Sequence, residues 1–179
     1  MHKDFKMGVL MCIHPSFPFL PTMNTNLNKT LLAFLLSIKD LDSPLSPTET
    51  ARLSDIAEQL SVNPSFETWQ RLTEPSLIAM VQENTSLNQR FQTVKSQLDT
   101  LDISISLDLI RSLESELDRV TPHKTKPIIR GIPDDSDERK NNEINNMVMS
   151  FSSRALKNPQ AVKNLSGLNK ISASLDRAT

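Results

Sequence analysis

Apolar side chains recur along the chain at steps of three and four residues, the spacing that places them on one face of an α-helix. The densest run lies within residues 28–41 and covers more than one helical face: Leu31, Leu32, Phe34, Leu35, Leu36, Ile38 and Leu41. A helix with so broad an apolar surface is either buried on several sides or docks a partner. We therefore count Phe34, Leu35 and Ile38 as candidate partner-binding residues.

The stretch from residue 46 to residue 76 predicts the starts of three further helices. The sequence Ser-Pro-Thr-Glu at 46–49 is a capping box with proline at the first helical position. The helix that follows has four apolar positions at helical spacing: Leu53, Ile56, Ala57 and Leu60. Asn63-Pro64 begins a short helix carrying Phe66, Trp69 and Leu72, and residues 73–75 open a longer one. We expect Trp69 to lie in the core rather than to anchor a partner.

The longer helix has the most regular apolar pattern in the chain. Its heptad positions between residues 77 and 101 are Leu77, Met80, Asn84, Leu87, Phe91, Val94, Leu98 and Leu101. At 1.5 Å per residue this seam would span roughly 37 Å, so a second helix or another chain must cover it. Leu87, Phe91 and Val94 join the candidate partner-binding residues.

A second apolar stripe at residues 110–120 could supply that cover. We predict an antiparallel αα-hairpin that turns near residue 103 and brings Arg90 close to Glu116. The same fold-back would place Lys95 near Glu114 or Arg111. A parallel homodimer remains the lesser alternative, because it would put Arg90 beside Lys95 of the second chain.

Asn84 is the only polar residue of the seam, and it is also a candidate partner-binding residue. Two interpretations of its role stay open. It either lies at the rim of the hairpin and bonds to water, or it fixes the register of a partner helix.

The segments outside residues 27–121 have a different character. Residues 1–26 are expected to be a disordered extension, of which 1–22 resemble a weak secretion signal or an upstream read-through preceding Met23. Residues 122–142 hold three prolines and a charge block, so we predict a disordered linker. Residues 143–179 predict a partly disordered C-terminal arm of weak amphipathic helices. The predicted fold class is all-α, a small helical bundle at 27–121 with these extensions.

Composition excludes several functional classes. The chain has three glycines and none between residues 9 and 130, so no glycine-rich phosphate-binding loop is present there. One cysteine, Cys12, permits neither an intrachain disulfide nor a thiolate zinc cluster. The three histidines lie outside the periodic segments. We predict a protein that is not an enzyme and holds no cofactor and no metal.

Residues 53–72 have the spacing of a helix-turn-helix, resting on Ile56, Ala57, Leu60 and Val62. Ala57 occupies the position where the two helices of such a unit approach closely, but Ser61 stands where the turn usually holds glycine. Residues 46–121 carry six Lys or Arg against twelve Asp or Glu, a net charge of −6, which repels duplex DNA.

These observations favour a cytoplasmic protein–protein interaction module that acts as an adaptor or regulatory accessory protein. Its partner would be another protein, with a homodimer possible and DNA unexpected. The alternative is a transcriptional or plasmid-type regulator with a degenerate helix-turn-helix at 53–72 and a coiled-coil dimerisation helix at 77–101. No run of 18 apolar residues predicts a membrane span.

Overall fold

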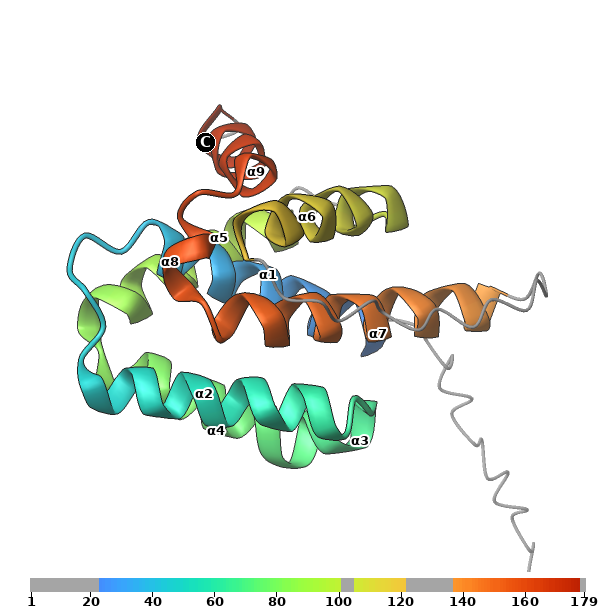
Figure 1. The fold of residues 1–179 in the computed structure, drawn as a ribbon, viewed down its shortest axis with the longest axis horizontal. Coiled ribbons are helices and arrows are strands. Elements are labelled where there is room, and N and C mark those ends of the chain that lie inside the picture. Colours follow the sequence, from blue (N-terminus) through green and yellow to red (C-terminus); the bar gives the residue numbers. More distant parts are fainter. Residues whose placement is uncertain (1–22, 101–104, 122–136, 178–179) are drawn as a thin grey trace, which may run out of the picture.

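A computed structural model describes residues 23–100, 105–121 and 137–177. All secondary structure in these ranges is helical, which confirms the predicted all-α class (Figure 1). The elements in chain order are α1 (Met23–Lys39), α2 (Pro47–Val62), α3 (Phe66–Thr68), the π-helical turn η1 (Trp69–Thr73), α4 (Glu74–Glu83), α5 (Thr85–Thr100), α6 (Leu107–Val120), α7 (Asp137–Leu156), α8 (Pro159–Val162) and α9 (Ser166–Arg177). No helix among the described residues is long and apolar enough to cross a membrane.

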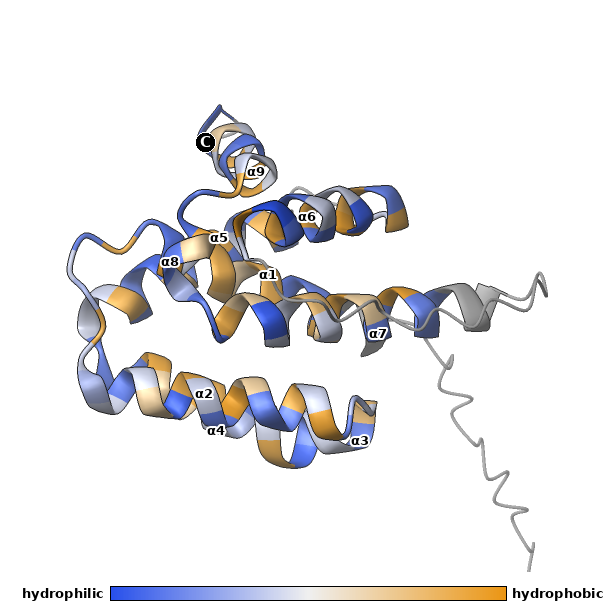
Figure 2. Ribbon diagram, in the orientation of Figure 1, coloured by the Kyte–Doolittle hydropathy of each residue, from blue (hydrophilic) through white to orange (hydrophobic). Residues whose placement is uncertain are grey.

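The helices form layers around α1 and α7, which lie in the middle of the molecule (Figure 1). α2 packs on α7 from one side and carries α3 and α4 with it, while α6 and α9 cover the opposite side. α5 packs along α1. Apolar and polar residues alternate along α2 and α6 at helical spacing, so each of these outer helices turns one apolar stripe inward (Figure 2).

α1 is the central helix of the core. Every residue from Leu31 to Ile38 is buried, and α5, α7 and α8 all pack against it. Of the two alternatives for its broad apolar surface, burial on several sides is therefore the one observed. The helix begins at Met23, so the last residues of the predicted extension are helical, whereas residues 1–22 lie outside the described part.

α2 begins as the sequence predicts. Ser46 Oγ accepts from the amide of Glu49 at 3.2 Å, and a carboxylate oxygen of Glu49 accepts from the Ser46 amide at 2.6 Å. Ala57 is fully buried where α2 meets α7, and its carbonyl accepts a 2.6 Å hydrogen bond from Ser153 Oγ. The small side chain at position 57 thus serves a close helix approach, but the neighbouring helix is α7 and not α3.

The predicted boundary between two helices near residue 73 is wrong. Backbone angles stay helical through Thr68, Trp69, Thr73 and Glu74, so α3, η1 and α4 form one continuous helical stretch. The Glu74 amide donates to the carbonyl of Trp69, five residues back. Pro75 has no amide hydrogen and its ring crowds the carbonyl four residues earlier, so the wider turn before it relieves that contact.

The π-helical turn also changes which side chains face the core. Trp69 is buried, as expected, and so is Thr73 at the end of the same π-helical turn. Leu72 was predicted on the same face but is 57% exposed, because the extra residue in the turn rotates it outward.

The predicted αα-hairpin is not the arrangement observed. α5 and α6 share no extended interface in the described residues; α5 packs along α1, and α6 packs along α7 and α9. The expected charge contacts are absent as well, since Arg90 bonds to Asp40 and Lys95 bonds to Asn26. Six seam residues are buried as predicted: Leu77, Met80, Leu87, Phe91, Val94 and Leu98. Asn84 is only partly buried, Leu101 lies outside the described residues, and α1 covers the buried side chains of α5.

The expected C-terminal arm is instead part of the core. α7 packs on α1, α2 and α6, and its apolar residues belong to the same buried cluster as α1: Met147, Val148, Met149, Phe151, Ala155 and Leu156. Asn28 of α1 donates to Asn145 of α7 at 2.8 Å within this interface. The described residues of 27–121 and of 143–177 therefore share one core. The predicted linker at 122–142 lies outside the described residues up to 136, and α7 begins at Asp137.

Two helices, α8 and α9, follow Asn158 among the described residues. α8 is a single turn, and the Asn158 side chain makes no capping bond there. α9 is held to α6 by Glu116, whose carboxylate accepts from Ser166 Oγ at 2.6 Å and from the Gly167 amide at 2.9 Å. A Cβ on Gly167 would lie 2.6 Å from Leu113 Cδ2, so glycine permits this close approach.

The position of Phe151 generates a stability prediction. We expect Phe151→Ala to lower the free energy of unfolding by about 3–5 kcal/mol, because the side chain is 1% exposed and its loss leaves a cavity between α7 and its neighbours. Val62→Ala, at a position 76% exposed, should change it by less than about 0.5 kcal/mol. Urea unfolding followed by circular dichroism measures both, and equal midpoints for the two variants would show that α7 is not part of the cooperative core.

Candidate functional site

The residues predicted to bind a partner lie mostly inside the chain. Phe34, Leu35 and Ile38 are at most 2% exposed, on α1. Leu87, Phe91 and Val94 are at most 5% exposed, on α5. All six belong to one buried cluster, so they are core residues and present no surface to a partner. A homodimer through residues 77–101 would use the same α5 side chains, which the chain itself buries.

Asn84 is a helix cap, a role that neither open interpretation described. Its backbone is extended (φ −108°, ψ 106°) and separates α4 from α5. Its side-chain oxygen accepts from the Leu87 amide at 3.0 Å, and its side-chain nitrogen donates to Glu49 at 2.7 Å. The single helix predicted over 77–101 is therefore interrupted at Asn84, whose side chain caps the start of α5 and ties it to the start of α2.

Glu49 is the acceptor at this junction. Burial raises the pKa of its carboxyl, but hydrogen bonds from Asn84 and Ser46 outweigh that effect and leave the pKa below its ordinary value. The negative charge also lies in the first turn of α2, where the helix dipole favours it.

The stretch that resembles a helix-turn-helix does not have the geometry of one. The second helix of such a unit would be α3, but α3 continues through η1 into α4 as a single stretch. Its one cation, Arg71, is paired with Glu67 at 3.0 Å. A helix that offers one neutralised cation provides little for phosphate contacts.

The layer formed by residues 47–83 is strongly acidic. It holds two arginines, Arg52 and Arg71, against six carboxylates, which gives a net charge of −4. Both arginines are engaged within the layer, Arg52 by Glu83 and Arg71 by Glu67. Asp55, Glu58 and Glu74 have no ion-pair partner among the described residues, and the first two are exposed. We call this surface of α2, α3, η1 and α4 the acidic layer.

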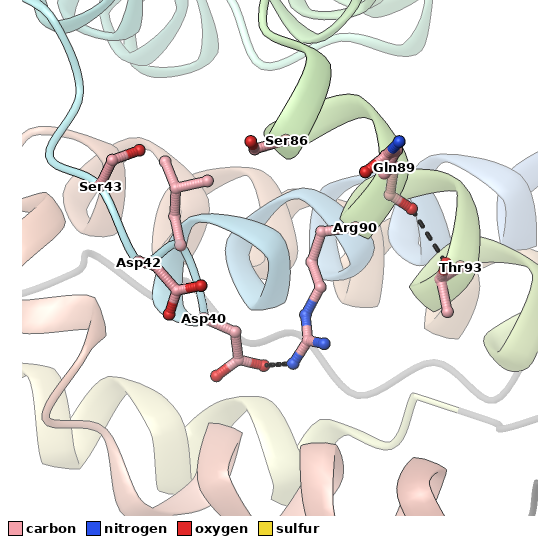
Figure 3. A pocket seen from close by; sticks show the side chains of 8 residues that line it. Asp40, Asp42, Ser43, Ser86, Gln89, Arg90 and Thr93 are labelled. Atoms are coloured by element: carbon pink, nitrogen blue, oxygen red, sulfur yellow. Dashed lines mark hydrogen bonds and ion pairs between the residues drawn. The ribbon is translucent and has the colours of Figure 1, made fainter.

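A polar groove of about 380 Å³ lies at the C-terminal end of α1, between the α1–α2 loop and α5 (Figure 3). Its lining is Asp40, Leu41, Asp42, Ser43, Ser86, Gln89, Arg90 and Thr93. Figure 3 shows Asp42 and Ser43 on the loop side, with Ser86, Gln89 and Thr93 on α5. Asp40 and Arg90 meet across the groove at 2.9 Å.

Asp40 joins three parts of the molecule at this groove. Its carboxylate accepts from Lys39 Nζ at 2.5 Å, from Arg90 of α5 at 2.9 Å and from Ser172 Oγ of α9 at 3.1 Å. Burial raises the pKa of Asp40, but the hydrogen bonds from Lys39 and Arg90 outweigh it, so the pKa lies below its ordinary value. Asp40 therefore carries its negative charge at neutral pH and holds α9 against the end of α1.

The groove holds no recognisable set of catalytic groups in the described part of the chain. No histidine or lysine lines the groove together with its hydroxyls, and its one arginine is neutralised by Asp40. No group of three or more potential metal ligands occurs among the described residues. Sequence reasoning missed Asp40 and Ser43, because nothing in the sequence links residue 40 to residue 90 or residue 172.

Comparisons with protein-family models, with curated proteins and with solved structures returned no match for this chain.

The charge of Asp40 generates a pH prediction. Because the folded-state pKa is depressed, the stabilisation by Asp40 is present above the unfolded-state pKa of about 3.9 and is lost as the pH falls through the folded-state value. We expect Asp40→Asn to lower the melting temperature near neutral pH and to differ less from the wild type near pH 3. Asp42→Asn, an exposed position on the same loop, is the matched control and should follow the wild type. An equal deficit of Asp40→Asn at both pH values would contradict this role for the charge.

Proposed function

We propose that this protein is a non-enzymatic protein-binding module, an adaptor or accessory protein, whose acidic layer receives a positively charged segment of a partner protein. The observation that carries the proposal is the unbalanced charge of residues 47–83, where three carboxylates have no cation beside them among the described residues. A folded surface that keeps like charges together destabilises itself slightly, and a basic partner would relieve that repulsion.

The two arginines of the acidic layer do not offset its attraction for cations, because both are already paired. Arg52 and Arg71 are already bonded to Glu83 and Glu67, so neither is free to attract an anionic partner. Asp55 and Glu58 lie one helical turn apart on the exposed side of α2. Lysine or arginine side chains of a partner would meet both carboxylates from the same direction.

The acidic layer also exposes apolar side chains that could anchor a partner. Val62 at the end of α2 is 76% exposed, and Leu72 on η1 is 57% exposed. Interfaces between proteins combine a few buried apolar anchors with a charged rim that sets orientation and association rate. Leu72 faces outward only because of the π-helical turn, so the same turn that accommodates Pro75 also places an apolar side chain on the surface.

Duplex DNA is the partner of the alternative function, and the charges of the acidic layer argue against it. DNA binding releases counterions only where cations meet phosphates, and this layer carries a net charge of −4. In a titration with mixed-sequence duplex at low salt we expect no binding. Steep salt-dependent binding would instead favour a regulator and overturn the proposal.

A site-specific crosslinking experiment tests the proposed surface. A photoreactive amino acid at position 72 should capture a discrete protein from native lysate, whereas the same group at Ser115, exposed on α6, should not. Capture should weaken with increasing salt, because exposed charges are screened beyond a Debye length of about 10 Å at 0.1 M.

The charge dependence has a matched control. Asp55→Asn with Glu58→Gln removes two negative charges from the acidic layer, and Asp108→Asn with Glu143→Gln removes two exposed ones elsewhere. We expect the first pair to reduce capture about tenfold, equivalent to about 1.4 kcal/mol, and the second pair to leave it unchanged. Equal loss for both pairs would show that only net charge matters and would contradict a defined binding surface.

A further inference from the structure

The α1–α2 loop carries two Ser-Pro pairs within five residues, Ser43-Pro44 and Ser46-Pro47. The only other hydroxyl residue followed by proline in the chain is Thr121. Kinases that require proline after the acceptor bind an extended, accessible segment. Proline favours this shape, because it disfavours helical angles in the residue before it. The structure distinguishes the three positions by what each hydroxyl already does.

Ser46 and Thr121 are both occupied by structural bonds. Ser46 Oγ accepts from the Glu49 amide, and the carboxylate of Glu49 lies 2.6 Å from the Ser46 amide. A phosphoryl group there would lose the helix cap and crowd a carboxylate. Thr121 is 9% exposed, and its hydroxyl donates to the Leu117 carbonyl at 2.6 Å.

Of the three hydroxyl residues followed by proline, Ser43 is the one whose hydroxyl is exposed and makes no structural bond. It is exposed, as is Pro44, and its hydroxyl has no hydrogen-bond partner among the described residues. It lines the polar groove with Arg90 (Figure 3). It also lines a smaller depression of about 80 Å³ with Lys163. Figure 3 shows the Ser43 hydroxyl on the loop wall of the groove, away from the Asp40–Arg90 pair.

We propose that Ser43 is a phosphorylation site for a proline-directed serine/threonine kinase, and that the fold selects it over Ser46. In the reaction Ser43 Oγ attacks the γ-phosphorus of a nucleoside triphosphate, and the bond from that phosphorus to the bridging oxygen breaks. The nucleoside diphosphate leaves with the electron pair, and the hydroxyl proton passes to the carboxylate base of the kinase. The product carries a charge of about −1.5 to −2 on the loop.

The surroundings of Ser43 hold two cations beside the carboxylates of Asp40 and Asp42. Arg90 lines the groove and Lys163 lines the adjoining depression, and each now donates to an oxygen of the same chain segment: Arg90 to Asp40, and Lys163 to the Leu41 carbonyl at 3.3 Å. Phosphate oxygens are strong acceptors for both cations. The proposal is independent of the partner suggested for the acidic layer.

The test compares the folded protein with a peptide of the same sequence. The peptide covers residues 38–52 and holds both serines free of structure, and the kinase is a mitogen-activated kinase chosen because it labels both serines in that peptide. With Mg²⁺ and ATP, fragment mass spectrometry follows the labelling of Ser43, Ser46 and Thr121 over time in peptide and full chain. We expect the Ser43-to-Ser46 rate ratio to be at least about fivefold higher in the folded protein, since labelling Ser46 requires loss of its cap. Thr121 should stay unlabelled.

Two variants complete the design. Ser43→Ala should abolish the fast phase of labelling, and Ser46→Ala should leave the rate at Ser43 unchanged, with circular dichroism verifying that both variants stay folded. An equal rate ratio in protein and peptide would overturn the proposal. Labelling of Ser46 before Ser43 in the folded protein, or no labelling of either serine there, would overturn it as well.

Discussion

The structure depends on the burial of one helix. α1 carries apolar side chains on nearly all sides, and residues 31–38 are all buried, so it is stable only if neighbours surround it. Each large side chain removed from water contributes about 1.5–3 kcal/mol, and α1 supplies more of them than any other element. The positions of α5 and α7 follow from this requirement, since both pack along α1. The outer helices contact the core on one side only, so one apolar stripe on each is enough to pack against it.

A few polar contacts orient the helices that this burial brings together. Asn28 bonds to Asn145 between α1 and α7, and Ser153 bonds to the Ala57 carbonyl between α7 and α2. Buried hydrogen bonds of this kind contribute little net stability but are costly to break, so they favour one register over its neighbours. Asn84 and Asp40 also orient helices, but they act at helix ends. Each forms hydrogen bonds with segments that lie far away in the sequence.

The sequence alone predicts the local features of each helix well, but it predicts poorly which helices pack against each other. Helix period and capping are local, so the capping box at Ser46, the burial of Trp69 and the inward face of α5 were all predictable. The π-helical turn was not, because Pro75 marks a disturbance without showing whether the helix ends or widens. Apolar periodicity also cannot say which helix covers which. The stripe of α5 fits α6 as well as α1 by pattern, and only the packing of the whole chain decides between them. For the same reason the candidate partner-binding residues turned out to be core, and the weak signal of α7 concealed its central place.

The pairing of α1 with α7 has a consequence for synthesis of the chain on the ribosome. Asn28 and its hydrogen-bond partner Asn145 are 117 residues apart. At about 5–20 residues per second, translation leaves α1 without this neighbour for roughly ten seconds. During that time α5 can already pack along α1, but the side of α1 that packs on α7 stays exposed to water on the nascent chain.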